Sequence, residues 1–321
     1  MDKYNCKEHF MQEFTYRKSG ELIRFPMGVV YGAKDGPTLA VVGGTHGCEF
    51  CGIQAAIDLY NNLDPAKVTG KVVIVMTYSF SSFLNNTSFI VPLDGKNAGG
   101  VFPGSLNGTV SEVMAYHLYY NVFGKERIDF MIELHGGGIP DAMTPFVLAL
   151  ETGDKALDDK IMEMAEIYGP DKILHSPVDP ADSEKPGACF KKLIGCGIPA
   201  MLTQSGQQGI LDLGAAKVHE NGMLNVMKKM GMLKGEPVGV AKQFTHLRAH
   251  PEIRTKVPGM WYQHVKLGQI VKKGDKLGEI RDYFGNKVID IHAQIDGMIT
   301  VYRSSPSVGV GNELIEMHPL L

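Results

Sequence analysis

The sequence predicts an α/β domain over residues 1–240 and a small β domain over residues 241–321. Up to about Gly239, apolar runs that suit strands alternate with amphipathic patterns that suit helices, which is typical of a sheet packed between helices. From Gln243 onward, short apolar runs are separated by glycine-containing turns, which is typical of an all-β domain. Hydrophobic residues make up 44% of the chain, which is enough for a sizeable core.

The expected sheet of the first domain consists of strands that are apolar almost throughout. The run Leu39-Ala40-Val41-Val42 is an example, and such strands suit a sheet that helices cover on both faces. The expected strands include Thr38–Val42, Lys71–Met76, Asp129–Leu134, Phe146–Leu150 and Ala200–Thr203. The expected helices include Glu49–Leu63, Glu112–Phe123, Lys155–Ile167, Ala188–Ile194 and Ala215–Met230.

The C-terminal part from Val257 to Met317 resembles a lipoyl-like or biotinyl-like β domain, mainly through the run from Val265 to Asp275. A domain that carries such a cofactor presents an attachment lysine in a hairpin. The comparable turn here, Gln294-Ile295-Asp296-Gly297, has no lysine. We therefore expect this domain to narrow the mouth of a site in the first domain or to mediate assembly, and not to carry a cofactor.

Composition and charge exclude several classes of partner. The net charge of −3 gives no basic surface for nucleic acid, and no run approaches the roughly 20 apolar residues that span a bilayer. The N-terminus is polar and unlike a signal peptide. An odd count of 5 cysteines fits a reduced, cytoplasmic protein. Cys48 and Cys51 have a C-x-x-C spacing without a second pair, so half-buried thiols are favoured over a structural zinc site.

The first candidate for chemistry is Gly43-Gly44-Thr45-His46-Gly47-Cys48-Glu49, which follows an expected buried strand and opens an expected helix. The glycines allow a tight turn from strand to helix, and His46 and Glu49, three residues apart, can face one point. An imidazole and a carboxylate are ligands that zinc takes in proteins. By itself, the spacing also fits a capping turn with an acidic residue in the first turn of a helix.

A third candidate ligand, His135, stands at the end of the apolar run Ile132-Glu133-Leu134. Ligands of open α/β sheets collect beyond the carboxyl ends of strands, and His46 also comes just after such an end. Two histidines and a glutamate, with a fourth position for water, are a ligand set of catalytic zinc. The sequence therefore predicts a Zn²⁺ site at His46, Glu49 and His135, against the alternative of two unrelated loop histidines.

Glu133 lies two residues before His135, so both side chains point to the same side of the strand. Glu133 could accept a hydrogen bond from the second ring nitrogen of a ligand histidine, or it could be a strand-end acid that the backbone satisfies. The sequence leaves both readings open. Eight other histidines lack a partner at ligand spacing and are expected to be surface or structural residues: His117, His175, His219, His246, His250, His264, His292 and His318.

Four motifs in a fixed order carry a resemblance to a known family. They are the Gly43–Glu49 segment, Phe102-Pro103-Gly104, the strand end at Leu134-His135 and Ile198-Pro199-Ala200, and a small β domain follows them. Together they resemble the succinylglutamate desuccinylase/aspartoacylase family, which is related to the zinc carboxypeptidases. The resemblance covers nearly the whole chain, and its nearest likeness is to bacterial deacylases of small N-acylated amino-acid-like compounds.

The resemblance implies a zinc-carboxypeptidase-like fold, in which a mixed eight-stranded sheet is flanked by helices. It also implies zinc ligands at His46, Glu49 and His135 and a substrate contact from Asn97. The reaction it implies is hydrolysis of an amide bond in a small-molecule substrate. A homo-oligomer is the default expectation for such enzymes.

One departure from the family pattern concerns the substrate. Where the family usually has Asn-Leu-Asn-Arg before Phe-Pro-Gly, this chain has Asn97-Ala98-Gly99-Gly100. The missing arginine would bind a substrate carboxylate with two parallel hydrogen bonds, and no nearby residue replaces that geometry. Lys96 could supply a point charge. The substrate is therefore expected either to lack that carboxylate or to present it elsewhere.

A second departure concerns catalysis. The family's catalytic glutamate follows the Ile-Pro-Ala motif, and the aligned residue here is Gln204. A glutamine amide cannot accept a proton from water at neutral pH, although it can orient water or donate to an oxyanion. Three explanations stay open. In the first, another carboxylate acts instead, with Glu133, Asp182 and Glu184 as candidates. In the second, the site catalyses different chemistry. In the third, the protein is a metal-binding pseudoenzyme or small-molecule binder.

Overall fold

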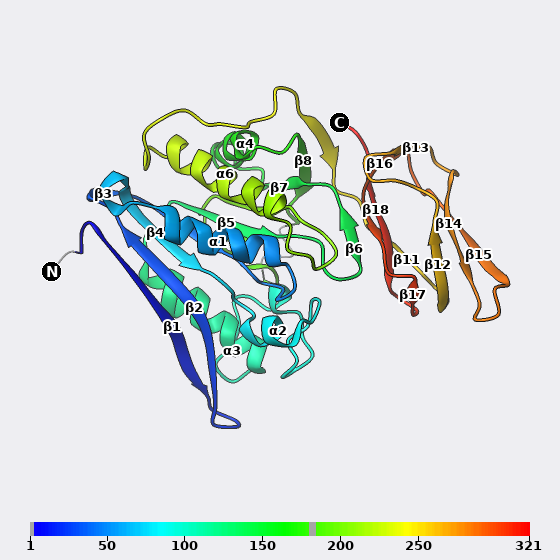
Figure 1. The fold of residues 1–321 in the computed structure, drawn as a ribbon, viewed down its shortest axis with the longest axis horizontal. Helices are drawn as coiled ribbons and strands as arrows, with labels where there is room; N and C mark the ends of the chain where they lie inside the picture. Colours follow the sequence, from blue (N-terminus) through cyan, green and yellow to red (C-terminus); the bar gives the residue numbers. More distant parts are fainter. Residues whose placement is uncertain (1–2, 180–183) are drawn as a thin grey trace.

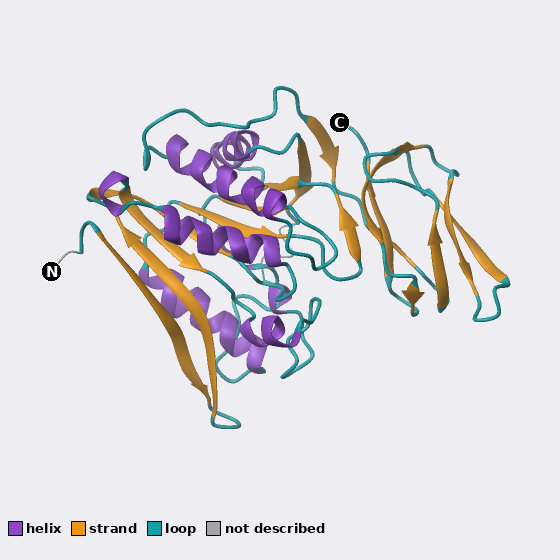
Figure 2. Ribbon diagram, viewed as in Figure 1, coloured by secondary structure: helices purple, strands orange, loops and turns teal. Residues whose placement is uncertain are grey.

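The computed structural model describes residues 3–179 and 184–321. It contains a nine-stranded mixed sheet flanked by helices, followed by two small antiparallel sheets at the C-terminus (Figure 1). Figure 2 shows that the helices belong to the first part of the chain and that the C-terminal part is built from strands and loops. The expected mixed α/β fold with a C-terminal β domain is confirmed.

The central strands of the large sheet are the apolar runs that the sequence predicts. Every residue of β5 is buried, and β5 is parallel to β3 on one side and to β9 on the other. β7 runs antiparallel to β9. The strand order is β1 (Cys6–Tyr16), β2 (Glu21–Tyr31), β4 (Thr69–Val75), β3 (Lys34–Val42), β5 (Phe130–His135), β9 (Ala200–Gln204), β7 (Phe146–Glu151), β8 (Lys172–Pro177) and β10 (Thr245–Arg248).

Helices cover both faces of this sheet. On β5, Leu134 contacts Gly52 of α1, whereas Glu133, which points the opposite way, accepts from the backbone N–H of Phe190 in α5. α1 and α6 lie side by side on the first of these faces (Figure 1). The helices are α1 (Phe50–Asn62), α2 (Phe80–Asn85), α3 (Val110–Tyr116), α4 (Lys155–Tyr168), α5 (Cys189–Gly195) and α6 (Leu213–Lys229), with short helical turns at Pro65–Lys67 and Ala98–Gly100.

The structure differs from the expectations at the edges of the sheet and in one helix. The resemblance implied eight strands, whereas the sheet has nine, and the strands expected from apolar runs did not include β1, β2, β8 or β10. The helix expected to run to Phe123 changes after Tyr116 to wider π-type turns over His117–Val122 and ends with a tight turn over Phe123–Lys125. The large sheet also extends past the expected boundary at residue 240, since β10 pairs with β8.

The C-terminal part has its own apolar core, which includes Trp261, Leu277 and Leu314. One sheet has the order β11 (Ile253–Arg254), β18 (Glu313–His318), β16 (Gly297–Arg303) and β13 (Ile270–Val271), and the other β15 (Lys287–His292), β14 (Lys276–Arg281), β12 (Gly259–Gln263) and β17 (Ser307–Val308). The short strand β6 (Asp141–Met143) of the first domain pairs with β16 and so joins the two parts. Among the helices described, none is long and apolar enough to cross a membrane.

Candidate metal centre

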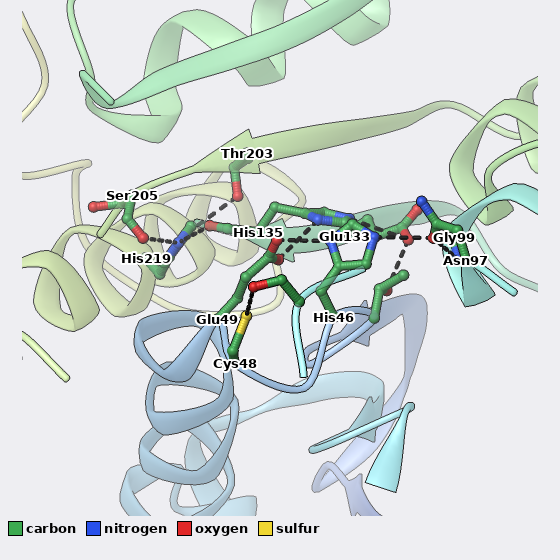
Figure 3. A network of polar contacts seen from close by, with 12 residues as sticks. His46, Cys48, Glu49, Asn97, Gly99, Glu133, His135, Thr203, Ser205 and His219 are labelled. Atoms are coloured by element: carbon green, nitrogen blue, oxygen red, sulfur yellow. Dashed lines mark hydrogen bonds and ion pairs between the residues drawn. The ribbon is translucent and has the colours of Figure 1, made fainter. Parts of the chain in front are cut away.

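The candidate centre forms where two neighbouring parallel strands end. His46 follows β3 by a few residues, and His135 is the last residue of β5; the two strands pair from Leu39 with Phe130 to Val42 with Glu133. The turn after β3 requires glycine at position 44, because its φ is +63° and a Cβ there would lie 3.0 Å from the Thr77 backbone. This turn leads into α1 and brings Glu49, at the start of the helix, beneath both imidazoles (Figure 3).

Glu49 contacts both histidines, one with each carboxylate oxygen. Its Oε1 is 2.6 Å from Nδ1 of His46, and its Oε2 is 2.9 Å from Nδ1 of His135. One ligand atom from each of the three residues can be chosen so that all lie within 4.8 Å of one another. Figure 3 shows the three side chains pointing toward one another. The structure thus brings together the three residues for which the sequence predicts zinc.

The electrostatics of these residues suit a cation. Burial alone would raise the pKa of Glu49, but the attraction of His46 and His135 outweighs burial and lowers that pKa to about 2. Burial would lower the pKa of His135, yet Glu49 and Glu133 together raise it to about 10. Oε2 of Glu49 and Nε2 of His135 are buried without a well-formed hydrogen bond. A carboxylate and two imidazoles are a donor set that zinc accepts, and the ion would take the place of the proton that His135 holds between Glu49 and Glu133, so the residues fit the ion.

Two further side chains hold the histidine rings in place. Oδ1 of Asn97 is 3.1 Å from Nε2 of His46 and accepts a hydrogen bond from the Gly99 N–H. Behind His135, Oε1 of Glu133 is 3.3 Å from Nε2 and accepts from the hydroxyl of Thr45. Such acceptors fix the ring tautomer so that Nδ1 of each histidine is free to bind a metal. This geometry fits the orienting role for Glu133, and it gives the oxygen of Asn97 a partner other than substrate.

We expect Glu133→Gln to weaken zinc binding by about 10- to 100-fold without loss of the fold, because the uncharged amide orients and polarises the His135 ring less well. Competition with a chelating dye would give the zinc affinity. Glu279→Gln is the matched control, since Glu279 is also buried and ion-paired, to Lys276 and Arg281, but belongs to the C-terminal part. An unchanged affinity in Glu133→Gln would leave Glu133 as a strand-end acid that the backbone satisfies.

The three residues line one end of a cavity of about 420 Å³. Gln204 lines it as well, because β9 places Gln204 directly beside His135 in the sheet. The side-chain oxygen of Gln204 is buried and has no hydrogen-bond partner. The opposite wall comes from the C-terminal part and from β6, through residues that the sequence analysis missed: Asp141, Met143, Arg254, Val301, Arg303, Asn312, Glu313 and Glu316.

Several other residues singled out from the sequence lie outside this cavity. Lys96 pairs with Glu112 at 3.1 Å, and neither it nor Glu133 is among the lining residues. Glu184 is exposed and does not line the cavity, and Asp182 lies outside the described residues. The five cysteines are free thiols. His219 is buried under the site and lies 2.9 Å from the carbonyl oxygen of His135, which is a structural position.

Comparisons with known proteins agree with this geometry. The sequence profile of the succinylglutamate desuccinylase/aspartoacylase catalytic domain matches residues 35–229. The chain is 26% identical to the N-alpha-acetyl-L-2,4-diaminobutyric acid deacetylase of Halomonas elongata, over 87% of this chain and 81% of that protein.

Solved structures show the same fold. A succinylglutamate desuccinylase from Silicibacter sp. TM1040 is 20% identical, with a TM-score of 0.86 over 98% of this chain and 95% of that one. The product-bound ectoine utilization protein EutE (DoeB) of Ruegeria pomeroyi is 21% identical, with a TM-score of 0.86 over 99% of this chain and 96% of that one. The match of the catalytic-domain profile to more than half of the sequence places this chain in the succinylglutamate desuccinylase/aspartoacylase family.

Proposed function

We propose that this protein is a zinc-dependent hydrolase that removes the acyl group from a small N-acylated amino-acid-like compound by cleaving its amide bond. The observation that carries the proposal is the convergence of His46, Glu49 and His135 on the wall of a cavity at two strand ends. Membership of the family and similarity to a protein named as a deacetylase of an N-acetylated amino acid support the reaction class.

Each residue of the site has a separate role in the proposed hydrolysis. His46, Glu49 and His135 would hold zinc, which would supply polarisation of the scissile carbonyl group and acidification of water. Asn97 and Glu133 orient the two imidazoles. Gln204 can accept a hydrogen bond through its unpartnered oxygen or donate one through its amide nitrogen, so it can orient water or substrate beside His135. The cavity wall from the C-terminal part encloses the substrate.

Metal analysis and a substrate panel test the proposal together. Protein purified without added metal is expected to contain about one zinc per chain and to release the acyl group from N-acetylated amino acids, detected by mass spectrometry. Removal of the metal with a chelator is expected to stop the reaction, and equimolar zinc to restore it. Protein that contains no zinc, and whose residual activity is indifferent to chelators, would contradict the proposal.

Gln204 favours one alternative, a protein that binds metal and ligand without turnover. It replaces the residue that would take a proton from water, and loss of a general base costs about 10²- to 10⁴-fold in rate. Zinc-loaded protein that binds N-acetylated amino acids in calorimetry, yet leaves them intact over long incubation, would support this alternative. Release of the acyl group at a rate proportional to the amount of zinc-loaded protein would exclude it.

A further inference from the structure

The cavity wall opposite the metal centre carries a pair of opposite charges that the two parts of the chain bring together. The short strand β6 lies next to the strands of the C-terminal part (Figure 1). Asp141 of β6 pairs directly with Arg303 of β16 in an antiparallel register, and Met143 pairs with Val301. Residues directly opposite each other in such a pair project from the same face of the sheet. All four side chains line the cavity, and the intervening pair, Ala142 and Tyr302, does not.

Although they are neighbours, the two charges do not neutralise each other in an ion pair. Among the described residues, no cationic group lies within 4.0 Å of the Asp141 carboxylate, and no acidic group lies that close to the Arg303 guanidinium. Arg303 donates from Nε to the carbonyl oxygen of Ser307 at 3.2 Å. This bond fixes the guanidinium and leaves both terminal nitrogens available for a carboxylate.

The position of the pair relative to the metal centre is fixed by backbone hydrogen bonds. The carbonyl oxygen of Asp141 accepts from Gln208 N–H at 2.8 Å, in the loop that follows Gln204. The carbonyl oxygen of Pro140 accepts from Ser304 N–H of the C-terminal part. On the metal side, Ser205 N–H donates to the carbonyl oxygen of His135. A substrate that reaches the metal centre therefore faces Asp141 and Arg303 at a set distance.

From this arrangement we propose that Asp141 and Arg303 form the specificity subsite of the deacylase, in which Arg303 binds a carboxylate and Asp141 binds an ammonium group of one N-acyl substrate. The substrate class is then an N-acylated amino acid with a second, cationic amine. This inference rests on the proposed function for the acyl-bearing end of the ligand. It also gives the carboxylate a partner in the C-terminal part, where the loop at Gly99-Gly100 offers none.

The charges around the pair argue against simpler substrates. Glu313 and Glu316 also line the cavity, and Arg254 is engaged by Glu252 and Glu313. A purely anionic ligand would meet three carboxyl groups beside one available guanidinium. A purely cationic ligand would leave Arg303 desolvated and without a partner. A neutral ligand would leave both Asp141 and Arg303 desolvated and without a partner. A ligand with both charges satisfies each.

The ionisation of the wall agrees with a site for a cation. Burial, with repulsion from Glu313, raises the pKa of Asp141 to about 7 despite the nearby Arg303. Burial, with repulsion from Glu316, raises the pKa of Glu313 to about 8. A raised pKa means that these carboxyl groups lack a compensating positive charge and hold a proton more readily, so a nearby ammonium ion would favour their ionised form and bind there.

Three matched N-acetyl compounds test the subsite on zinc-loaded, full-length protein. Nα-acetylornithine carries both charged groups, Nα-acetylnorvaline lacks the amine, and N-acetylputrescine lacks the carboxylate. Nα-acetyl derivatives of shorter diamino acids test which distance between the two charged groups fits best. We expect kcat/KM to be highest for a diamino acid. Arg303→Gln should lower kcat/KM for Nα-acetylornithine about 10- to 100-fold and leave kcat/KM for N-acetylputrescine unchanged. Asp141→Asn should lower kcat/KM for Nα-acetylornithine by a similar factor and leave kcat/KM for Nα-acetylnorvaline unchanged.

Exposed charges of the same types provide controls. Arg24→Gln on β2 and Asp159→Asn on α4 remove an arginine and an aspartate whose side chains are 52% and 64% exposed, and should leave all three rates unchanged. Zinc content and melting temperature verify the fold of each variant. Rates in Arg303→Gln and Asp141→Asn that fall equally for all three compounds, or do not fall, would overturn the inference.

A binding measurement separates this inference from the proposed function. Calorimetry with free ornithine, norvaline and putrescine reports the same selectivity without any turnover. The protein could prefer ornithine, lose that preference in both variants and yet cleave no N-acetyl compound. This result would contradict the deacylase function and support the subsite. Cleavage of N-acetyl compounds without a preference for ornithine would contradict the subsite and support the deacylase function.

Discussion

Replacement of His135 by alanine is expected to abolish stoichiometric zinc binding and to lower turnover of N-acyl substrates by at least about 10³-fold. The Nδ1 atom of His135 lies 2.9 Å from Glu49 and would be one of the three ligand atoms, and without it only His46 and Glu49 would face the metal. Zinc contributes several kcal/mol to the stabilisation of charge in the transition state, and each 1.4 kcal/mol corresponds to about tenfold in rate. Metal content and initial rates measured on the same sample test both effects.

The same substitution is expected to destabilise the metal-free protein at neutral pH. Glu49 and Glu133 are both almost completely buried, and His135 is the cationic partner that they share. Removal of one member of a buried charged cluster typically costs about 3–5 kcal/mol, because the remaining charges lose their compensation. Denaturant unfolding measures this cost. His292→Ala is the control, since His292 is exposed in the C-terminal part. A His135→Ala protein that keeps one zinc per chain would contradict the assignment of the ligands.

The fold could be predicted from the sequence where burial dictates residue type. β5, β9 and the second half of β3 lie in the middle of the sheet with helices on both faces, so they are mostly apolar and buried, which marks them as strands. β1 contains Lys7, Glu8 and Glu13, and most of its residues are partly or fully exposed. Its hydrogen bonds to β2 hold it in the sheet, and that pairing leaves no apolar pattern to detect.

The candidate site divides in the same way. His46 and Glu49 are three residues apart, and His46 and His135 stand at or just after the ends of apolar strands. Local spacing and the positions of the strand ends were therefore enough to predict that the three residues meet. Asp141 and Arg303 belong to different parts of the chain and meet only because β6 pairs with β16. Each stands in a short strand without a motif. Contacts between distant segments depend on how the two parts dock, which local sequence patterns do not encode.

The substitution Gln204→Glu is expected to raise kcat for amide cleavage by about 10²- to 10⁴-fold, the range that a positioned general base contributes. Gln204 ends β9 beside His135, lines the cavity and keeps its buried side-chain oxygen free of protein partners. A carboxylate of nearly the same size would occupy that position without repacking. It could take a proton from water and pass it to the leaving amine, which the carboxamide cannot do.

A control must show that any gain in kcat depends on the position of the new carboxylate and not only on its negative charge. Gln208→Glu adds a carboxylate in the loop that follows β9, at an exposed residue that does not line the cavity, and is expected to leave kcat unchanged. Both variants should retain zinc, which separates a gain in proton transfer from a change in metal loading. A wild-type activity that disappears in Gln204→Glu would contradict the expectation, because it would show that the carboxamide itself takes part in the reaction. A wild type without activity that becomes an enzyme through this one substitution would instead show a protein that kept the metal centre and the cavity after losing its proton acceptor.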